Sequence, residues 1–163
     1  MYYSEFTVTT QEVPGEISLC LTITGCPIHC KGCHSPYLWK PGSGQLLTDR
    51  LYHDLLERYQ GQASCVLFMG GEWHPKELAH KLEEAKSMGY NTCLYTGKDK
   101  LDSQITRQLT WVKYGPWKSE KGGLDSHGTN QRFIKVATNE LLNHLFIKNK
   151  NVKTYRITGK KEN

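Results

Sequence analysis

Short apolar runs recur along the chain and predict a series of strands. Residues 16–24 alternate apolar and polar side chains and are rich in Ile and Thr, which is the pattern of a half-buried strand. Short apolar runs farther along indicate more strands of similar length. The full set of predicted strands is 16–24, 64–69, 91–96, 111–114 and 131–137, with a further one at 154–158.

Amphipathic stretches between these runs predict helices. Thr48 or Asp49 caps the first helix and Gly61 ends it, while Pro75 opens the second and Gly89 ends that one. The expected apolar faces are Leu51, Leu55 and Tyr59 on the first helix, and Leu78, Leu82 and Ala85 on the second. Further helices are expected around Leu101, Ile105 and Leu109 and over residues 140–146.

Two segments between the predicted elements are rich in Gly and Pro. Residues 36–45 predict irregular structure, and residues 115–130 predict a long loop. Loops of this length are uncommon in compact domains and are often functional.

Strands that alternate with helices predict an α/β fold with a mostly parallel sheet. A closed eight-fold barrel takes ~250 residues, so this chain of 163 residues fits a partial (β/α) barrel or an open sheet. We expect one domain over residues 1–163, with a core at about 16–137 and a basic tail at about 148–163. Loops that follow parallel strands meet at one sheet edge, which is where ligands bind in such folds.

Composition narrows the class of protein. Hydrophobic residues make up 37% of the chain and charged residues 23%, as in a globular protein. The longest apolar run, Cys65–Met69, is far shorter than the ~18 residues of a membrane-spanning helix, and the first residues lack a secretory pattern. We therefore expect a cytoplasmic protein with no membrane partner.

The net charge of +5 comes without a dense basic stripe, so no nucleic-acid partner is expected. The basic tail is read as a solvated end, with a docking surface for an acidic partner as the alternative.

Six cysteines fall into two sets. Cys26, Cys30 and Cys33 crowd into the loop TITGCPIHCKGCH, and a cytosolic cluster of this kind favours metal binding over disulfides. Each of the others lies inside a predicted strand and is expected to be a small core residue; they are Cys20, Cys65 and Cys93.

Thiolate ligands suit zinc or an iron–sulfur cluster. A closed zinc site needs a fourth ligand, for which His29 or His34 is available. A [4Fe–4S] cube normally takes four cysteines. With only three, one iron keeps a position that a substrate or cofactor can occupy.

The spacing Cys26-x-x-x-Cys30-x-x-Cys33 resembles the cluster motif of the radical S-adenosylmethionine (radical SAM) enzymes. The resemblance implies that these cysteines hold a [4Fe–4S] cluster and that S-adenosylmethionine chelates the fourth iron. One electron from the reduced cluster then cleaves the sulfonium and leaves a 5′-deoxyadenosyl radical. Cofactor contacts are implied at the backbone of Gly32, Cys33 and His34, although many members carry an aromatic residue where this chain has Gly32.

The triplet Gly70-Gly71-Glu72 follows the second predicted strand, where the same family has a GGE motif that accepts hydrogen bonds from the amino group of the cofactor. By itself the triplet is equally typical of a turn with a helix-capping acid. Trp73 replaces the proline that often follows, and Pro75 comes two residues later.

Other segments are similar to small activases of glycyl radical enzymes, in particular those of anaerobic (class III) ribonucleotide reductase. These segments are Trp39, Gly44-Gln45, Tyr95-Thr96-Gly97, Val112 to Trp117, and Gly128-Thr129-Asn130-Gln131-Arg132, which lacks one spacer residue. The resemblance covers residues 16–135 and adds Thr96 and Asn130 as cofactor contacts. Asp125 and His127 are expected to be loop residues without a catalytic role, because the reaction needs no protein acid or base.

The function that the resemblance implies is activation of anaerobic ribonucleoside-triphosphate reductase through a glycyl radical, with reduced flavodoxin or a similar protein as electron donor. Three alternatives stay open: an activase of another glycyl radical enzyme, a radical SAM enzyme for a small molecule, and a zinc or iron–sulfur module without enzymatic activity.

Overall fold

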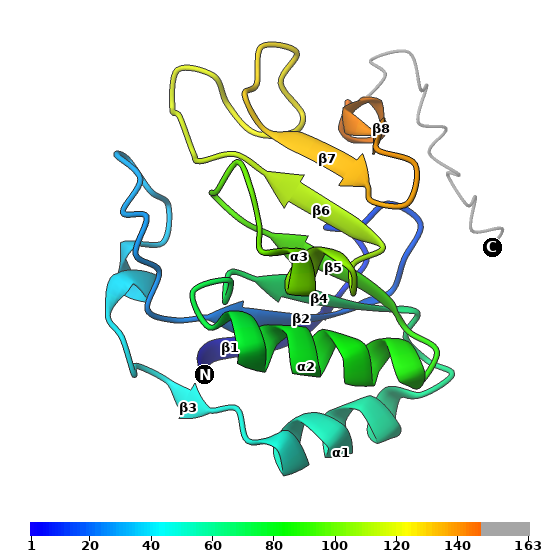
Figure 1. Cartoon of the computed structure of the whole chain (residues 1–163). Helices are drawn as coiled ribbons and strands as arrows, with labels where there is room; N and C mark the ends of the chain where they lie inside the picture. The colour runs from blue at the N-terminus through cyan, green and yellow to red at the C-terminus, as the bar shows by residue number, and fades with distance from the viewer. Residues whose placement is uncertain (148–163) are drawn as a thin grey trace, which may run out of the picture.

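The computed structural model describes residues 1–147, which form an eight-stranded sheet with helices packed against it (Figure 1). The strands are β1 (Tyr2–Thr9), β2 (Ser18–Ile23), β3 (Gln45–Leu46), β4 (Cys65–Met69), β5 (Asn91–Tyr95), β6 (Trp111–Tyr114), β7 (Arg132–Lys135) and β8 (Glu140–Leu141). The helices are α1 (Asp49–Tyr59), α2 (Pro75–Ser87) and α3 (Ser103–Thr106), with short 3-10 helices η1 (Pro36–Trp39) and η2 (Asn143–Phe146).

The strand order is β3-β1-β2-β4-β5-β6-β7-β8, so the sheet is open and the α/β class is confirmed. The pairings β2–β4, β4–β5 and β5–β6 are parallel, as helical crossovers require. The pairings toward both edges are antiparallel. The expectation of a mostly parallel sheet is therefore correct only for its centre. The outer strands are joined by connections without a crossover helix, and such connections favour antiparallel neighbours.

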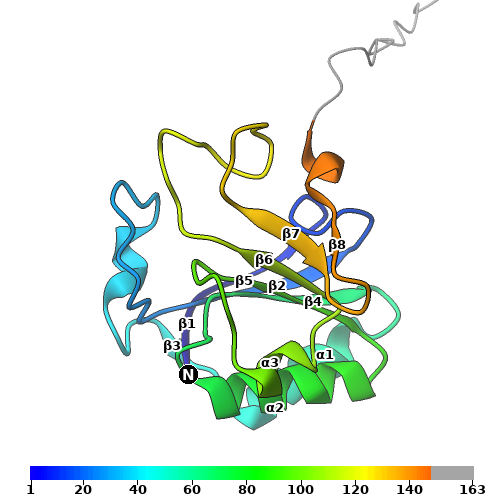
Figure 2. The ribbon, with the colours of Figure 1, turned by 45° about the horizontal axis from the view of Figure 1, so that its top comes forward.

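Figure 2 shows α1, α2 and α3 together on one face of the sheet. Side chains alternate along the strands, so Leu19 and Leu21 of β2 join the larger core cluster with these helices. Cys20, between them, joins a smaller cluster on the opposite face, which also contains Cys65, Cys93, Leu67 and Phe133. The prediction that Cys20, Cys65 and Cys93 are core residues is confirmed, because each is at most 3% exposed.

The first helix begins as expected, since the Thr48 hydroxyl accepts a hydrogen bond from the Leu51 amide. The predicted face is only part of the buried one: Tyr52 and Leu56 are fully buried, whereas Leu51, Leu55 and Tyr59 are partly buried, with Leu51 and Tyr59 packed against the core. The Tyr52 hydroxyl donates to the Lys81 carbonyl of α2, which turns this side of the helix inward. The second helix has the predicted bounds to within two residues and buries Leu78, Leu82 and Ala85.

Several local predictions were wrong. The strand β1 was missed, and the segment 36–45 holds the short helix η1. The third helix spans only Ser103–Thr106, because the chain then turns to reach β6. The predicted helix 140–146 is instead β8 followed by η2. There the Asn143 side chain accepts from the Phe133 amide and donates to the Gln131 carbonyl, which ties the segment to β7. The strand predicted at 154–158 lies outside the described residues.

Within residues 1–147, no helix combines the length and the apolar character that crossing a membrane demands.

Candidate iron–sulfur site

The loop with three cysteines follows β2 at the edge of the sheet where the loops after β4 and β5 also lie (Figure 1). The Leu38 carbonyl accepts from the amides of Gly25 (2.7 Å) and Cys26 (3.0 Å), which fixes the start of the loop to η1. The Cys33 amide bonds to the Cys30 carbonyl at 3.1 Å, and the Ser35 amide donates to the Cys33 sulfur at 3.4 Å. The backbone therefore shapes the loop and gives the Cys33 sulfur a hydrogen-bond donor.

Cys26, Cys30 and Cys33 are all partly exposed, unlike the cysteines of the strands. Burial raises the pKa of the Cys26 thiol, and backbone N–H groups of Ile28 and His29 partly oppose that rise. Among residues 1–147, no three His, Cys, Asp or Glu side chains converge as ligands of a single metal ion. A [4Fe–4S] cube does not require such convergence, since each thiolate binds a different iron.

The two histidines of the loop lie against tryptophans. The rings of His29 and Trp39 stack with centroids 4.6 Å apart, and those of His34 and Trp117 are 4.2 Å apart and tilted. Trp117 comes from the long loop 115–130, so this loop packs directly on the cysteine loop. Its indole nitrogen lies 4.0 Å from where a side chain at Gly32 would begin.

Gly70, Gly71 and Glu72 follow β4 in a turn that depends on glycine. Gly70 has φ of +82°, and a Cβ there would lie 2.6 Å from the Trp73 ring. Glu72 is only 4% exposed. Its Oε1 accepts from the Thr96 hydroxyl at 2.6 Å, and its Oε2 is buried with no hydrogen-bond partner in the described part of the chain. A buried carboxylate oxygen of this kind calls for a donor from a ligand.

These groups share one cavity of about 340 Å³. Among the predicted site residues, its walls contain Cys26, Cys30, Cys33, His34, Gly70, Glu72 and Thr96. The structure thus brings together three loops that the sequence separates by about seventy positions.

Gly32, Gly71 and Asn130 do not line this cavity. Gly71 instead faces Ile23, and a Cβ built on Gly71 would lie 3.3 Å from that side chain. Asn130 donates to the Pro116 carbonyl at 3.0 Å and so holds the start of the long loop in place. Their predicted cofactor contacts are therefore not part of the cavity wall that the structure describes.

Lys113 is a site residue that the sequence did not single out. It lines the cavity from β6, and its Nζ donates to the Gly115 carbonyl at 3.2 Å and lies over the Tyr95 ring. Burial lowers the pKa of Lys113 to about 8, although the negative charges of Cys30 and Glu72 oppose this shift. The available signal was its position two residues after Trp111, which places both on the face of β6 opposite the buried Val112.

The indole N–H groups of Trp73 and Trp117, both in the cavity wall, are buried and have no partner in residues 1–147. Along with Lys113, they add N–H donors and one cation to the wall that also contains the acceptor oxygen of Glu72. Such a cavity suits a ligand with both an ammonium and a carboxylate group, beside three thiols that can bind a metal cluster.

The sequence matches the family of 4Fe-4S single cluster domains over residues 13–113. This is more than half of the chain, so the protein belongs to this family and is an iron–sulfur protein. No curated protein shows significant similarity to it. No solved structure shows a significant match. The matched segment contains all six cysteines, so the match alone does not select the ligands, whereas exposure and grouping favour Cys26, Cys30 and Cys33.

Proposed function

We propose that this protein is a radical SAM activase that generates a glycyl radical on anaerobic ribonucleoside-triphosphate reductase. Cys26, Cys30 and Cys33 would hold three irons of a [4Fe–4S] cluster, and S-adenosylmethionine would complete the fourth. Membership of a single-cluster [4Fe–4S] family supports the first half of this proposal. The residues opposite the cysteines support the second half.

The observation that carries the proposal is the buried Oε2 of Glu72, which faces no protein donor in residues 1–147 and lines the same cavity as the three cysteines. The ammonium group of methionine is a donor of the right charge for it. The Lys113 ammonium, on the same wall, can pair with the methionine carboxylate. The Thr96 hydroxyl keeps Oε1 of Glu72 occupied, so that Oε2 alone is left for the ligand.

Held by Cys26, Cys30 and Cys33, the cluster would supply one electron, received from a reduced flavodoxin-type donor, for the reductive cleavage of S-adenosylmethionine, and the Cα hydrogen of a glycine in the reductase would end in 5′-deoxyadenosine. The chain's own residues bind and orient the cofactor and exclude water, and they need supply no acid or base. The half-buried cavity serves this purpose, since its walls include Ile23, Ile28 and two tryptophans.

Anaerobic reconstitution with iron and sulfide tests the proposal. The protein should gain broad visible absorption and, with S-adenosylmethionine and dithionite, release 5′-deoxyadenosine. Addition of the reductase should then produce an oxygen-sensitive glycyl radical signal in electron paramagnetic resonance. A cluster-loaded protein that never cleaves S-adenosylmethionine would indicate an iron–sulfur module without this activity. Cleavage with a signal only on another glycyl radical enzyme, or only with a small-molecule substrate, would reassign the target.

A further inference from the structure

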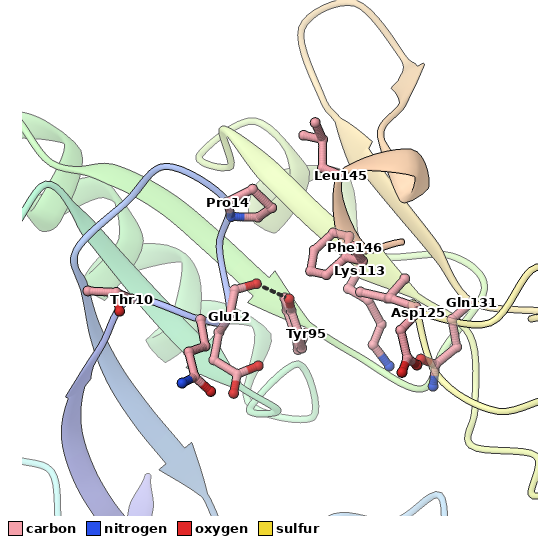
Figure 3. A pocket seen from close by; sticks show the side chains of 11 residues that line it. Thr10, Glu12, Pro14, Tyr95, Lys113, Asp125, Gln131, Leu145 and Phe146 are labelled. Carbon is pink, nitrogen blue, oxygen red and sulfur yellow. Dashed lines mark hydrogen bonds between the residues drawn. The ribbon is translucent and has the colours of Figure 1, made fainter. Parts of the chain in front are cut away.

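A second and larger cavity, of about 750 Å³, lies on the face of the sheet away from the helices (Figure 3). The turn between β1 and β2 forms one side of it, through Thr10, Gln11, Glu12 and Pro14. The other side is formed by Leu124 and Asp125 of the long loop, Gln131 just before β7, and Leu145 and Phe146 of η2. The Tyr95 hydroxyl donates to the Glu12 carbonyl and so fixes the turn to the end of β5.

This second cavity adjoins the candidate iron–sulfur site. Tyr95, Lys113 and Gln131 line both cavities, so these three side chains are the partition between them. A group seated in the second cavity therefore lies next to the candidate iron–sulfur site, across these side chains. Neither the fold nor the cluster requires such a space, which points to a second ligand.

The lining suits a polypeptide. Side-chain amides and a hydroxyl, from Gln11, Gln131 and Thr10, can bond to the donors and acceptors of a peptide backbone. Leu145 lies at the rim and is 50% exposed although it is a large apolar residue, as is common where another protein binds. Phe146 beside it adds an aromatic surface of the kind enriched at interfaces.

The charges of the lining argue against an anionic ligand. Figure 3 shows the carboxylates of Glu12 and Asp125 on opposite sides of Tyr95. Among the described residues, Lys113 is the one cation of the lining, and it also lines the candidate iron–sulfur site, where we assign it to the methionine carboxylate. A phosphate, a nucleotide or a nucleic acid would meet both carboxylates, whereas a neutral or basic peptide segment would be attracted by them.

We propose that the second cavity binds the glycine-bearing segment of the partner protein and presents its Cα to the neighbouring cofactor. This inference rests on the proposed function and adds to it the place and the chemistry of partner docking: an extended, neutral or basic segment that contacts Leu145 and passes between Glu12 and Asp125. Hydrogen transfer needs direct contact, so a side chain of the partition, Tyr95, Lys113 or Gln131, must move aside when the segment binds.

The substitution Leu145→Asp tests the proposal, with Leu141→Asp as its matched control. Leu141 is equally exposed, at 53%, and lies four residues away in β8, but it does not line the cavity. Neither side chain is needed for the core, so both variants should fold and load a full cluster. We expect Leu145→Asp to lower the yield of glycyl radical on purified anaerobic ribonucleoside-triphosphate reductase about tenfold or more. Partner-free cleavage of S-adenosylmethionine by dithionite should stay at the wild-type rate in both variants.

A double charge reversal on the lining gives a second test. Glu12→Lys together with Asp125→Lys should raise the concentration of reductase needed for half-maximal radical formation, again with unchanged partner-free cleavage. The docking proposal is overturned if Leu145→Asp and Leu141→Asp give the same radical yield, or if Leu145→Asp slows partner-free cleavage to the same degree as radical transfer. A wild-type protein that cleaves no S-adenosylmethionine would instead refute the proposed function, which keeps the two failures apart.

Discussion

The chain holds two sets of three cysteines whose surroundings are opposite in every respect. Cys26, Cys30 and Cys33 lie in one loop within eight residues of each other, are partly exposed, and line a cavity with a buried carboxylate and a lysine. Cys20, Cys65 and Cys93 lie one on each of three adjacent parallel strands and are buried among apolar side chains. The same thiol is therefore a potential metal ligand in one place and a small core residue in the other.

Ionisation separates the buried set from a metal ligand. Metal binding and nucleophilic chemistry require the thiolate. Burial raises the pKa of both Cys20 and Cys65 to about 12, with a smaller push from nearby carboxylates, and it raises the pKa of Cys93 well above its ordinary value. These thiols stay protonated at neutral pH. In the loop, the Ser35 amide instead donates to the Cys33 sulfur, and all three cysteines are partly exposed, so that a cluster can reach them.

The largest effect should come from removal of one loop cysteine. We expect Cys30→Ala to abolish the cluster, with iron and sulfide content and visible absorption falling to background after anaerobic reconstitution. Cys65→Ala should keep a full cluster and lower the free energy of unfolding by only about 1–2 kcal/mol, because it deletes one buried sulfur atom. Equal loss of iron in both variants would show that the strand cysteines also serve the cluster.

The second prediction concerns the cavity wall that distinguishes the loop cysteines from the strand cysteines. Glu72→Gln keeps the shape of the side chain but removes the charge that we assign to the cofactor ammonium. The affinity of the cluster-loaded protein for S-adenosylmethionine should fall about tenfold or more by anaerobic calorimetry, since a hydrogen bond to a charged group contributes ~1.5–3 kcal/mol. The matched control is Glu83→Gln, an exposed acid on α2, which should bind as the wild type does. Unchanged affinity in Glu72→Gln would remove this residue from the site.

The sequence predicted the central strands and the convergence of their loops better than it predicted the outer strands of the sheet. Short apolar runs and helix caps located β2, β4, β5 and β6 and the helices α1 and α2, because these elements are stabilised by local patterns. The rule that loops after parallel strands converge then placed Cys26 to Cys33 beside Glu72 and Thr96. This rule needs only the order of strands and helices along the chain, and no knowledge of which residues are in contact.

What the sequence could not predict depends on long-range contacts. The strand β1 exists because it pairs with both β2 and β3, and its own residues include several charged and polar ones. The face of α1 was set by the contact of Tyr52 with Lys81 on α2. Lys113 became a site residue only through its place on the inward face of β6, next to loops from elsewhere in the chain. Such features follow from tertiary packing and carry no local signature.

The third prediction compares the reactivity of the two sets directly. After removal of the cluster with a chelator, iodoacetamide at pH 8 should modify Cys26, Cys30 and Cys33 within minutes, as mass spectrometry of peptides would show. Modification of Cys20, Cys65 and Cys93 should be slower by about two orders of magnitude or more, because these thiols are both buried and protonated. With the cluster loaded, the loop cysteines should also be protected. Rapid labelling of Cys93, the most deeply buried, in folded protein would contradict the difference that we describe.

The smallest effect is a dependence of stability on alkaline pH that the buried thiols impose. The ordinary pKa of a cysteine thiol is 9.0, and burial raises that of Cys65 to about 12. Below pH 9 both the folded and the unfolded chain keep this proton. Between pH 9 and 12 the unfolded chain loses it while the folded chain retains it, so the stabilisation that is fully present below pH 9 declines as pH rises. Lys113 has the opposite effect on the free energy of unfolding above pH 8, because its pKa is lowered to about 8 on folding.

The effect of Cys65 must therefore be measured as a difference between variants. Urea unfolding of cluster-loaded wild type and Cys65→Ala at pH 8 and pH 10 should show that the wild type loses about 1 kcal/mol more over this interval. Parallel losses in the two proteins would mean that Cys65 ionises as freely in the folded chain as a loop cysteine does, and the distinction between the two sets would then rest on position alone.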